Sequence, residues 1–328
     1  MSSYFYAGYR WLPMVAIMAV VAGCNSPSDG TVIRKDRVSI IGHGDRIRKL
    51  SFAPSGKMLA SGSEDGTVKI WDTATWQLVR SIEGRAESPP KVMAVRYSSD
   101  GKKLAVGRAG GPFQLCDDSG KVVLGLGGDQ EHVWDIAFSP DGKHIATVRA
   151  NFVDVWNAET GARAKSIEVS DNQLWCVAYS PDSKWVATGG FEPDVVRITN
   201  VELGTPGQTL KGFRSFAGSL AFFPDGKTIA TGGDFVWLHD PTNGQEKAML
   251  QGHNAGSRSV AISADGARLV SAGGAGDLRV WDLAAKKVLA TYWGSPREEL
   301  WSVALSPDGK TIVSGSAKGT LKVWDMVK

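Results

Sequence analysis

Side chains that could carry out acyl transfer occur close together near the start of the chain. His43, Ser61 and Asp65 fall within one short stretch. A serine whose proton passes to a histidine, itself oriented by an aspartate, is the arrangement of many hydrolases. That chemistry needs the serine and histidine within hydrogen-bond reach of each other. The question is therefore which elements hold these three residues, and for what purpose.

Other residue types that could perform chemistry show no useful spacing. The five histidines, at positions 43, 132, 144, 239 and 253, follow no common interval, so we expect no metal site. Cys116 and Cys176 are sixty residues apart and match no metal or redox spacing. We expect both cysteines to be small core residues. We therefore expect no metal ion and no cofactor.

The third cysteine, Cys24, ends an apolar run. Arg10 is the only charged residue among the first 28, and "WLPMVAIMAVVAG" behind it is too short for a membrane-spanning helix of about 20 residues. This layout is typical of a secretory signal peptide. The stretch "VAGC" resembles the lipobox of bacterial lipoproteins, which implies that residues 1–23 are removed and that Cys24 carries the lipid. The alternative is an ordinary signal peptide or an uncleaved anchor with a coincidental cysteine.

The lipobox resemblance also implies a destination. Asn25 is not the aspartate that would favour the inner membrane, so we expect a lipid-anchored protein on the periplasmic or outer-membrane side. Without Arg10 the chain has 36 Lys and Arg against 34 Asp and Glu (37 minus 1, against 34), and it contains no basic run. A near-neutral chain of this kind predicts no nucleic-acid partner.

The sequence repeats. One turn occurs seven times with small changes: "FAPSGK", "YSSDGK", "FSPDGK", "YSPDSK", "FFPDGK", "ISADGA" and "LSPDGK", starting at residues 52, 97, 138, 179, 222, 262 and 305. Pro, Asp and Gly in this order favour a tight hairpin, because proline presets φ, aspartate bonds to the backbone and glycine takes a positive φ. The chain therefore contains seven related units.

A second marker follows each turn. It reads "VKIWD" in the first repeat, and the tryptophan position falls at residues 71, 116, 156, 199, 239, 281 and 324. A period of 40 to 45 residues with a Trp-Asp signature is typical of a four-stranded propeller blade. From residue 37 to about 326 the chain resembles the WD-repeat family. The resemblance implies an all-β fold, a seven-bladed β-propeller of four-stranded antiparallel blades.

The family pattern also gives the triad-like residues a structural role. In the first repeat His43, Ser61, Asp65 and Trp71 stand where the family has a buried hydrogen-bonded tetrad. This explains their spacing better than catalysis does, so we expect no catalytic residues. We expect only this blade to have all four members. The sixth and seventh repeats have Ala275 and Lys318 where the aspartate belongs, and the second, fourth and fifth replace the tryptophan with Cys116, Thr199 and His239.

Propellers must close, because an open ring exposes unpaired strand edges. The chain stops at "WDMVK", which leaves no room for a last strand, whereas residues 36–44, "DRVSIIGHG", have the pattern of one. We expect this N-terminal strand to complete the last blade, with Val38, Ile40 and Ile41 against Leu321, Val323 and Trp324. Residues 36–328 would form the propeller, and residues 24–35 the lipidated cysteine and a flexible tether.

The preferred function is a membrane-anchored, non-catalytic scaffold whose face binds a protein, a peptide or a small ligand. An alternative is an extracytoplasmic hydrolase of the lactonase or esterase type with its site at the central channel. Such a site needs paired carboxylates, a metal cluster or an activated nucleophile, and none recurs at equivalent positions of the repeats.

A candidate binding face comes from the start of the innermost strands. At one equivalent position the repeats carry Arg48, Met93, Trp134, Trp175, Gly218, Arg258 and Trp301. These residues would surround one mouth of the channel, where tryptophan and arginine could stack on a ligand and bond to it. Strand alternation leaves an alternative, because it places Trp175 on the side of Val177 and Tyr179, so that the rings would continue the packing between blades.

Overall fold

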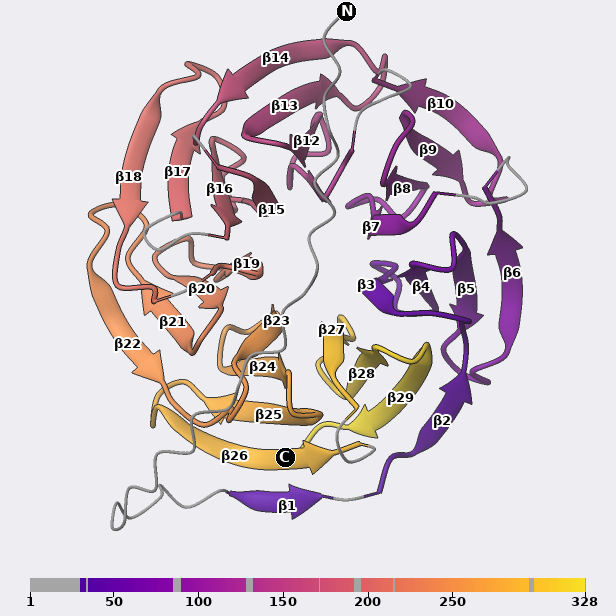
Figure 1. Cartoon of the computed structure of the whole chain (residues 1–328), viewed down its shortest axis with the longest axis vertical. Helices are drawn as coiled ribbons and strands as arrows, with labels where there is room; N and C mark the ends of the chain where they lie inside the picture. The colour runs from indigo at the N-terminus through magenta and orange to yellow at the C-terminus, as the bar shows by residue number, and fades with distance from the viewer. Residues whose placement is uncertain are drawn as a thin grey trace, which may run out of the picture.

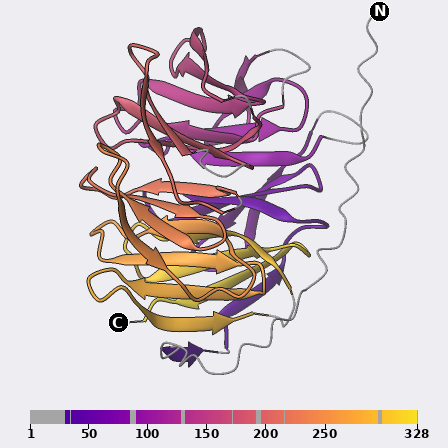
Figure 2. The same cartoon turned by 60° about the vertical axis from the view of Figure 1, so that its left-hand side comes forward.

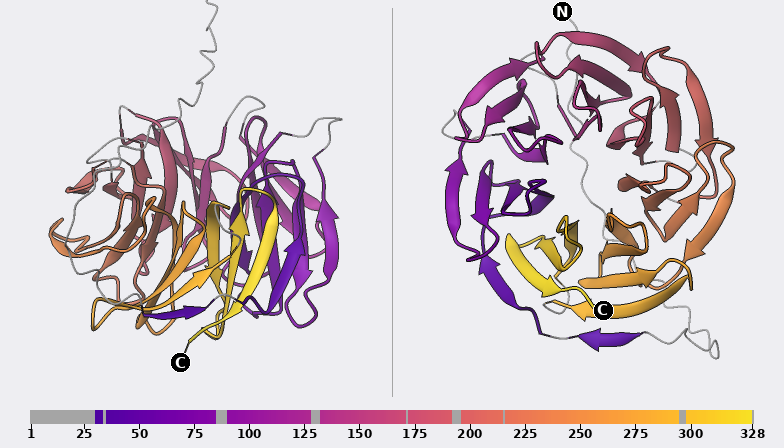
Figure 3. Two further views of the ribbon diagram at one scale, coloured as in Figure 1. Left: turned by 60° about the horizontal axis from the view of Figure 1, so that its bottom comes forward. Right: turned by 180° about the vertical axis from the view of Figure 1, so that it is seen from behind.

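The described residues form a ring of seven sheets, six of them four-stranded and one five-stranded (Figure 1). This computed structural model describes residues 30–33, 35–84, 90–127, 132–170, 172–191, 196–214, 216–294 and 298–327. The four strands of each blade are antiparallel, and in blades one to six they run in sequence order from the centre of the ring to its rim (Figures 1 and 3). The predicted seven-bladed propeller is therefore confirmed.

Blades one to four begin at the strand that follows the first Gly-His pair. Their strands are β3 (Ile47–Phe52), β4 (Met58–Ser63), β5 (Val68–Asp72) and β6 (Leu78–Ile82); β7 (Val92–Tyr97), β8 (Lys103–Arg108), β9 (Phe113–Asp117) and β10 (Val122–Leu126); β11 (Asp135–Phe138), β12 (His144–Arg149), β13 (Phe152–Asn157) and β14 (Arg163–Glu168); and β15 (Leu174–Tyr179), β16 (Trp185–Gly190), β17 (Val196–Asn200) and β18 (Pro206–Leu210).

Blades five to seven complete the ring. Their strands are β19 (Ser219–Phe222), β20 (Ile229–Gly232), β21 (Val236–His239) and β22 (Glu246–Leu250); β23 (Ser257–Ile262), β24 (Arg268–Gly273), β25 (Asp277–Asp282) and β26 (Lys287–Trp293); and β27 (Leu300–Leu305), β28 (Thr311–Ser316), β29 (Thr320–Asp325) and β2 (Val38–Ile41). The remaining strand is β1 (Thr31–Ile33).

The repeated turn joins the two innermost strands of each blade. In blade seven the Ser306 hydroxyl donates to Asp308 at 2.6 Å and accepts from the Thr311 amide at 2.9 Å, which locks the hairpin. The glycine of this turn, Gly309, has a φ of +71°, a conformation that costs glycine little. In blade four Ser183 takes this position with a φ of +62°. All seven of these turns lie on one face of the ring, opposite the start of the innermost strands.

Apolar side chains form one core at each junction between neighbouring blades. Seven clusters of buried residues account for the junctions, and each draws its members from two adjacent blades. At the junction of blades seven and one, for example, Val323 and Leu321 pack with Leu59 and Trp71. Each blade is thus buried on both faces only when the ring is closed.

Side chains of the innermost strands add lateral hydrogen bonds between blades. Ser219 accepts from the Val260 amide and Ser259 accepts from the Val303 amide, each at 3.2 Å. These bonds connect blade five to blade six and blade six to blade seven. The inner wall of the ring is therefore tied by polar contacts as well as by packing.

The N-terminal strand closes the ring as predicted. Strand β2 is antiparallel to β29, with Val38 opposite Val323 and Ile40 opposite Leu321. Arg37 adds an ion pair with Asp325 at 2.6 Å beside this strand. Ile41 lies opposite Thr320 and is largely exposed, so it contributes little to the core. The last blade thus combines the two ends of the propeller sequence.

A second N-terminal strand was not expected. Strand β1 pairs in parallel with β26 and makes blade six five-stranded, on the outer rim of the ring (Figures 1 and 2). Its sequence, Thr-Val-Ile, is β-branched throughout, which favours a strand. Ile33 packs against the core between blades six and seven. Residues 31–33 are therefore held on the ring and are not part of a flexible tether, whereas residues 24–29 lie outside the described residues.

Candidate functional site

The triad-like residues of blade one form a closed, buried hydrogen-bond chain. His43 Nε2 lies 2.7 Å from the Ser61 hydroxyl and His43 Nδ1 lies 3.0 Å from Asp65. Trp71 Nε1 donates to the same Ser61 hydroxyl at 2.8 Å, and Ser61 has no exposed surface. A substrate carbonyl could not reach this oxygen, so the arrangement resembles a hydrolase triad in connectivity but cannot act as one.

The charge state of Asp65 fits this structural role. Burial alone would raise the pKa of the Asp65 carboxyl, but hydrogen bonds from His43, Thr67 and the Gly44 amide outweigh burial and lower it. The carboxylate is therefore ionised and holds His43 Nδ1 as a donor, so that His43 Nε2 accepts from Ser61.

Blade six contains a second complete tetrad, which the sequence pattern missed. Ala275 occupies the expected aspartate position, but Asp277, two residues later at the start of β25, lies 2.7 Å from His253 Nδ1. His253 Nε2 lies 2.6 Å from Ser271, which accepts from Trp281 at 2.8 Å. The expectation that only blade one has all four members is therefore wrong, because a carboxylate on the strand can replace one in the preceding turn.

The other blades keep part of the tetrad or none of it. Trp324 donates to Ser314 at 3.2 Å and Trp156 donates to Thr147 at 2.9 Å. Cys116, Thr199 and His239 occupy the tryptophan position in three blades and are all buried. A tetrad is thus an addition to the blade core and not a requirement for it.

The two described cysteines are core residues. Cys116 and Cys176 are free and fully buried, and burial raises the pKa of Cys116 to about 11 and that of Cys176 further. Thiols with raised pKa values are poor nucleophiles. Cys24 lies outside the described residues.

The predicted binding residues meet at one mouth of the channel, and β-bulges place them there. In five blades the register of the innermost strand shifts around one residue, and those residues are Arg48, Met93, Trp175, Arg258 and Trp301. A bulge leaves the extra residue outside the ladder and changes the direction of its side chain. Strict alternation therefore does not apply to Trp175, and the argument that it faces the same side as Val177 loses its basis.

These side chains line a cavity of about 290 Å³. All six predicted members of the face line it, together with Gly218: Arg48, Met93, Trp134, Trp175, Arg258 and Trp301. We call these six residues the mouth site. Lys49, Phe216 and Ser259 also line the cavity and were not predicted. Lys49 and Ser259 each follow a bulge residue, so the bulge is the signal that was missing.

Three guanidinium groups surround Trp301. Those of Arg46, Arg48 and Arg258 lie 4.2, 4.8 and 4.2 Å from the centre of its ring, within the range of cation–π contacts. The Trp301 indole nitrogen donates to Glu299 at 3.0 Å, and Glu299 lies 3.5 Å from Arg258. Trp301 is thus a fixed platform with its edge bonded and its faces in contact with cations.

Glu64 anchors the arginines of blade one. It lies 2.7 Å from both Arg46 and Arg48 and also bonds to Lys91. Burial alone would raise the pKa of the Glu64 carboxyl, but the bond from Lys91 and the charges of Arg48 and Arg46 lower it to about 2. Burial lowers the pKa of Arg48 itself, although its attraction to Glu64 opposes this change.

An ion pair crosses the channel beside the cavity. Lys49, on the innermost strand of blade one, lies 2.9 Å from Asp135, on the innermost strand of blade three. Asp135 is 2% exposed and also accepts from the Val177 amide of blade four at 3.2 Å. Together with the Val177 bond, this pair therefore links blades one, three and four.

The aromatic residues on the other side of the mouth are partly packed and partly open. Trp134 stacks on His132 at 6.5 Å and also packs against the core between blades three and four. Trp175 lies 5.3 Å from Phe191, which is 61% exposed. The indole nitrogen of Trp175 is buried and has no hydrogen-bond partner in the part of the chain that the structure describes.

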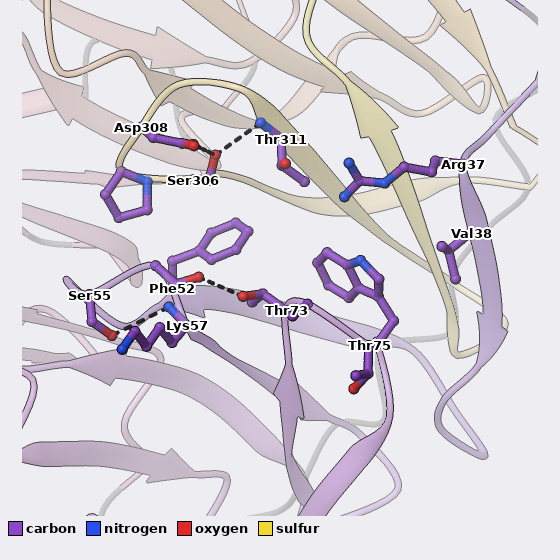
Figure 4. A pocket seen from close by; sticks show the side chains of 14 residues that line it. Arg37, Val38, Phe52, Ser55, Lys57, Thr73, Thr75, Ser306, Asp308 and Thr311 are labelled. Carbon is purple, nitrogen blue, oxygen red and sulfur yellow. Dashed lines mark hydrogen bonds between the residues drawn. The ribbon is translucent and has the colours of Figure 1, made fainter.

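A larger cavity, of about 750 Å³, lies on the opposite face between blades seven and one (Figure 4). Its hydroxyl groups already serve their own turns: Thr73 donates to the Gly56 carbonyl at 2.7 Å, and Ser306 bonds to Asp308 and Thr311 (Figure 4). These hydroxyl groups thus maintain the hairpins, and Arg37, which also lines the cavity, pairs with Asp325. The mouth site is the stronger candidate because its aromatic and charged side chains are not needed for any turn.

The described ranges were compared with the patterns of metal sites and of membrane-spanning helices. Among those residues no three His, Cys, Asp or Glu side chains group as metal ligands would. No helix there has the length and apolar character that crossing a membrane requires.

Comparison with known proteins identifies the repeats. The family model described as "WD domain, G-beta repeat" matches residues 35–72, 120–157, 163–194, 204–236, 244–282 and 286–325. These matches cover more than half of the chain. The unmatched stretch between residues 72 and 120 contains the first three strands of blade two, where Cys116 replaces the tryptophan.

The similar curated proteins match over short stretches. "Ribosome biogenesis protein ERB1" of Ajellomyces capsulatus is 41% identical over 64 residues, which is 20% of this chain and 8% of that protein. "Ribosome biogenesis protein BOP1 homolog" of Drosophila virilis is 52% identical over 42 residues (13% and 5%), and mouse "Ribosome biogenesis protein BOP1" is 49% identical over 41 residues (12% and 6%). The chain thus spans less than a tenth of each of these relatives.

Proposed function

The chain belongs to the WD-repeat family, and from this premise we propose that it is a non-catalytic scaffold whose mouth site binds a peptide or a small ligand. The observation that carries the proposal is the set of five bulges, which turn Arg48, Met93, Trp175, Arg258 and Trp301 into one cavity. Bulges are frequent next to functional sites because they redirect side chains at the cost of ladder pairing.

The composition of the mouth site supports binding over catalysis. The residues that line it include no carboxylate, cysteine or histidine. Of the other possible nucleophiles among them, Ser259 accepts from the Val303 amide and Lys49 pairs with Asp135. The buried Ser61 and Ser271 already accept from tryptophan side chains. No observation on the described residues favours the alternative of a lactonase or esterase at the channel.

Export and lipid anchoring are further parts of the proposal. They rest on the apolar run before Cys24 and on "VAGC", and they place the ring outside the cytoplasm on a bacterial membrane. If Cys24 is acylated, residues 25–30 are the only link between the lipid and strand β1. Six residues span at most about 20 Å, so the rim at blades six and seven would stay close to the membrane surface.

The anchoring proposal is tested with Cys24→Ser. Two or three acyl chains hold a protein stably on a membrane, so we expect the variant to be released or to remain unprocessed. Fractionation and the mass of the mature N-terminus measure this. Processing at the same site with unchanged membrane association would contradict lipidation and leave the mouth-site proposal untouched.

The binding proposal is tested with the double variant Trp175→Ala with Trp301→Ala. We expect a folded ring that no longer captures its partner in a crosslinking pull-down from the native membrane. Trp185→Ala, a tryptophan on the opposite face of blade four, is the matched control and should keep capture. Unchanged capture by the double variant, or loss of the fold, would overturn the proposal and assign the two rings to packing.

A further inference from the structure

The mouth site has two chemically different halves. Blades one, six and seven contribute Arg48, Lys49 and Arg258 with the Trp301 platform. Blades two to five contribute Met93, Trp134, Trp175 and Phe216. One half of the cavity wall is therefore cationic and the other half is apolar and aromatic.

The cationic half is incompletely neutralised. The three cations that line the cavity pair with Glu64, Asp135 and Glu299, none of which lines it. Glu64 is shared with Arg46 and Lys91 as well. This local network thus has five cations and three carboxylates, a formal excess of two positive charges (5 minus 3); Arg48, Lys49 and Arg258 line the cavity, and Arg46 and Lys91 lie outside it.

Burial makes that excess matter. Arg48 and Arg258 have lost much of their hydration, since only 25% and 23% of their side-chain surface is exposed. This burial lowers the pKa of both guanidinium groups. Charges with few waters and too few counter-charges gain more from a bound anion than exposed ones do.

The apolar half offers one unused polar group. The buried Trp175 indole nitrogen can only donate a hydrogen bond, and it has no acceptor among the described residues. A buried donor without a partner is destabilising, and an acceptor oxygen of a bound ligand would relieve this. This is an observation independent of the charges, and it also points to a ligand with an acceptor oxygen.

We propose that the mouth site binds a carboxylate attached to a compact apolar group, as in the C-terminal residue of a peptide. The carboxylate would lie against Arg48, Arg258 and Lys49, and the apolar side chain against Met93, Trp134 and Phe216. A volume of about 290 Å³ equals that of about ten water molecules, so it suits an end group and not an internal loop. This inference rests on the proposed function, because it assigns a ligand class to the same site.

The test uses two peptides of the sequence acetyl-Gly-Gly-Phe, one with a free C-terminal carboxylate and one with a C-terminal amide, together with 3-phenylpropanoate. Binding is measured by calorimetry. We expect the free-acid peptide to bind at least tenfold more tightly than the amide. If 3-phenylpropanoate binds as tightly as the acid peptide, the same chemistry holds and the source is a small free acid.

Three variants locate the binding. Arg258→Gln should weaken binding of the acid peptide about tenfold or more and change binding of the amide peptide little. Trp175→Phe keeps an aromatic side chain but removes the N–H donor. It should weaken binding of the acid peptide several-fold without a change in melting temperature. Arg268→Gln, an arginine in an ion pair on β24 away from the mouth, is the matched control and should change nothing.

The outcomes separate this inference from the proposed function. Equal affinity for acid and amide, or an acid affinity unaffected by both Arg258→Gln and Trp175→Phe, would overturn the carboxylate assignment. No binding of any probe would also overturn it, while partner capture lost in the Trp175 and Trp301 double variant would still support the mouth as the binding face. Capture retained in that double variant would overturn the proposed function itself.

Discussion

The two faces of the ring are built by the same seven repeats, yet they differ in how far the repeats agree. On the turn face all seven hairpins share one residue with positive φ, and five of them share a serine and aspartate lock, as in Ser98, Ser139 and Ser306. On the mouth face the bulge position holds arginine, methionine or tryptophan. Agreement marks what every blade needs to fold, and disagreement marks what the whole ring can recognise.

The buried polar groups show the same contrast. In the tetrads each donor has an acceptor, as with Trp71 and Ser61 or Trp281 and Ser271. At the mouth Trp175 lacks one, and Glu64 is shared by three cations. Groups that complete a blade are satisfied within it, whereas those at the mouth leave capacity for a ligand.

The largest effect is expected when the closing strand is deleted, because both faces of the ring depend on closure. Deleting residues 36–41 takes away β2 and exposes the edge of β29, so we expect aggregation and a fall in melting temperature of about 10 °C or more. The matched control deletes residues 31–33, which form only a fifth, parallel strand at the rim, and should have a much smaller effect. Similar melting temperatures for the two deletions would contradict closure through β2.

The second prediction concerns the tetrads. Asp277→Ala should destabilise the protein by about 1–3 kcal/mol, since it leaves His253 and Arg279 without their carboxylate. Asp65→Ala should cost less, because the Asp65 side chain is 18% exposed and that of Asp277 only 1%. Denaturant unfolding measures both.

A control tests whether Asp277 truly replaces the missing aspartate. Ala275→Asp restores the family residue in blade six but should not stabilise it, because His253 Nδ1 already has its acceptor. A clear gain from Ala275→Asp would show that the strand carboxylate is an inferior substitute.

The number of blades, their order and the closing strand could be predicted because turn and Trp-Asp markers are local and repeat. The second tetrad could not, since Asp277 is displaced from the family spacing and reaches His253 only in three dimensions. The Lys49 and Asp135 pair is also invisible in sequence, because these residues of blades one and three meet only in the folded ring. The mouth residues could be predicted from their equivalent position in each repeat. The bulges that turn them inward could not, because they depend on the register in which the two innermost strands pair.

The third prediction concerns how the ion pairs of Glu64, beside the mouth site, contribute to stability at different pH values. The pKa of Glu64 is lowered from 4.5 to about 2 by its cations despite burial, so its contribution to stability is present above pH 4.5 and lost as the pH falls towards 2. Glu64→Gln should therefore lower the melting temperature at pH 7, and the difference from the unmodified protein should shrink on acidification. Thermal unfolding at pH 7, 4.5 and 3 measures this; a constant difference would contradict the assigned ion pairs.

The smallest effect is expected when Ser183, which departs from the repeat on the turn face, is replaced by the glycine of the other blades. Ser183 has a φ of +62° where other blades carry glycine, a conformation that costs a non-glycine residue about 1–2 kcal/mol. Ser183→Gly removes that strain but frees the unfolded chain and loses the bond from the Asp141 amide, which is 3.1 Å long and exposed. The opposing changes should nearly cancel, leaving a melting temperature equal to or a few degrees above that of the unmodified protein. Ligand binding at the mouth, measured by the same calorimetry, should not change, because Ser183 lies at the far end of blade four. A loss of binding in Ser183→Gly would show that departures on the turn face also serve recognition, and the distinction between the two faces would fail.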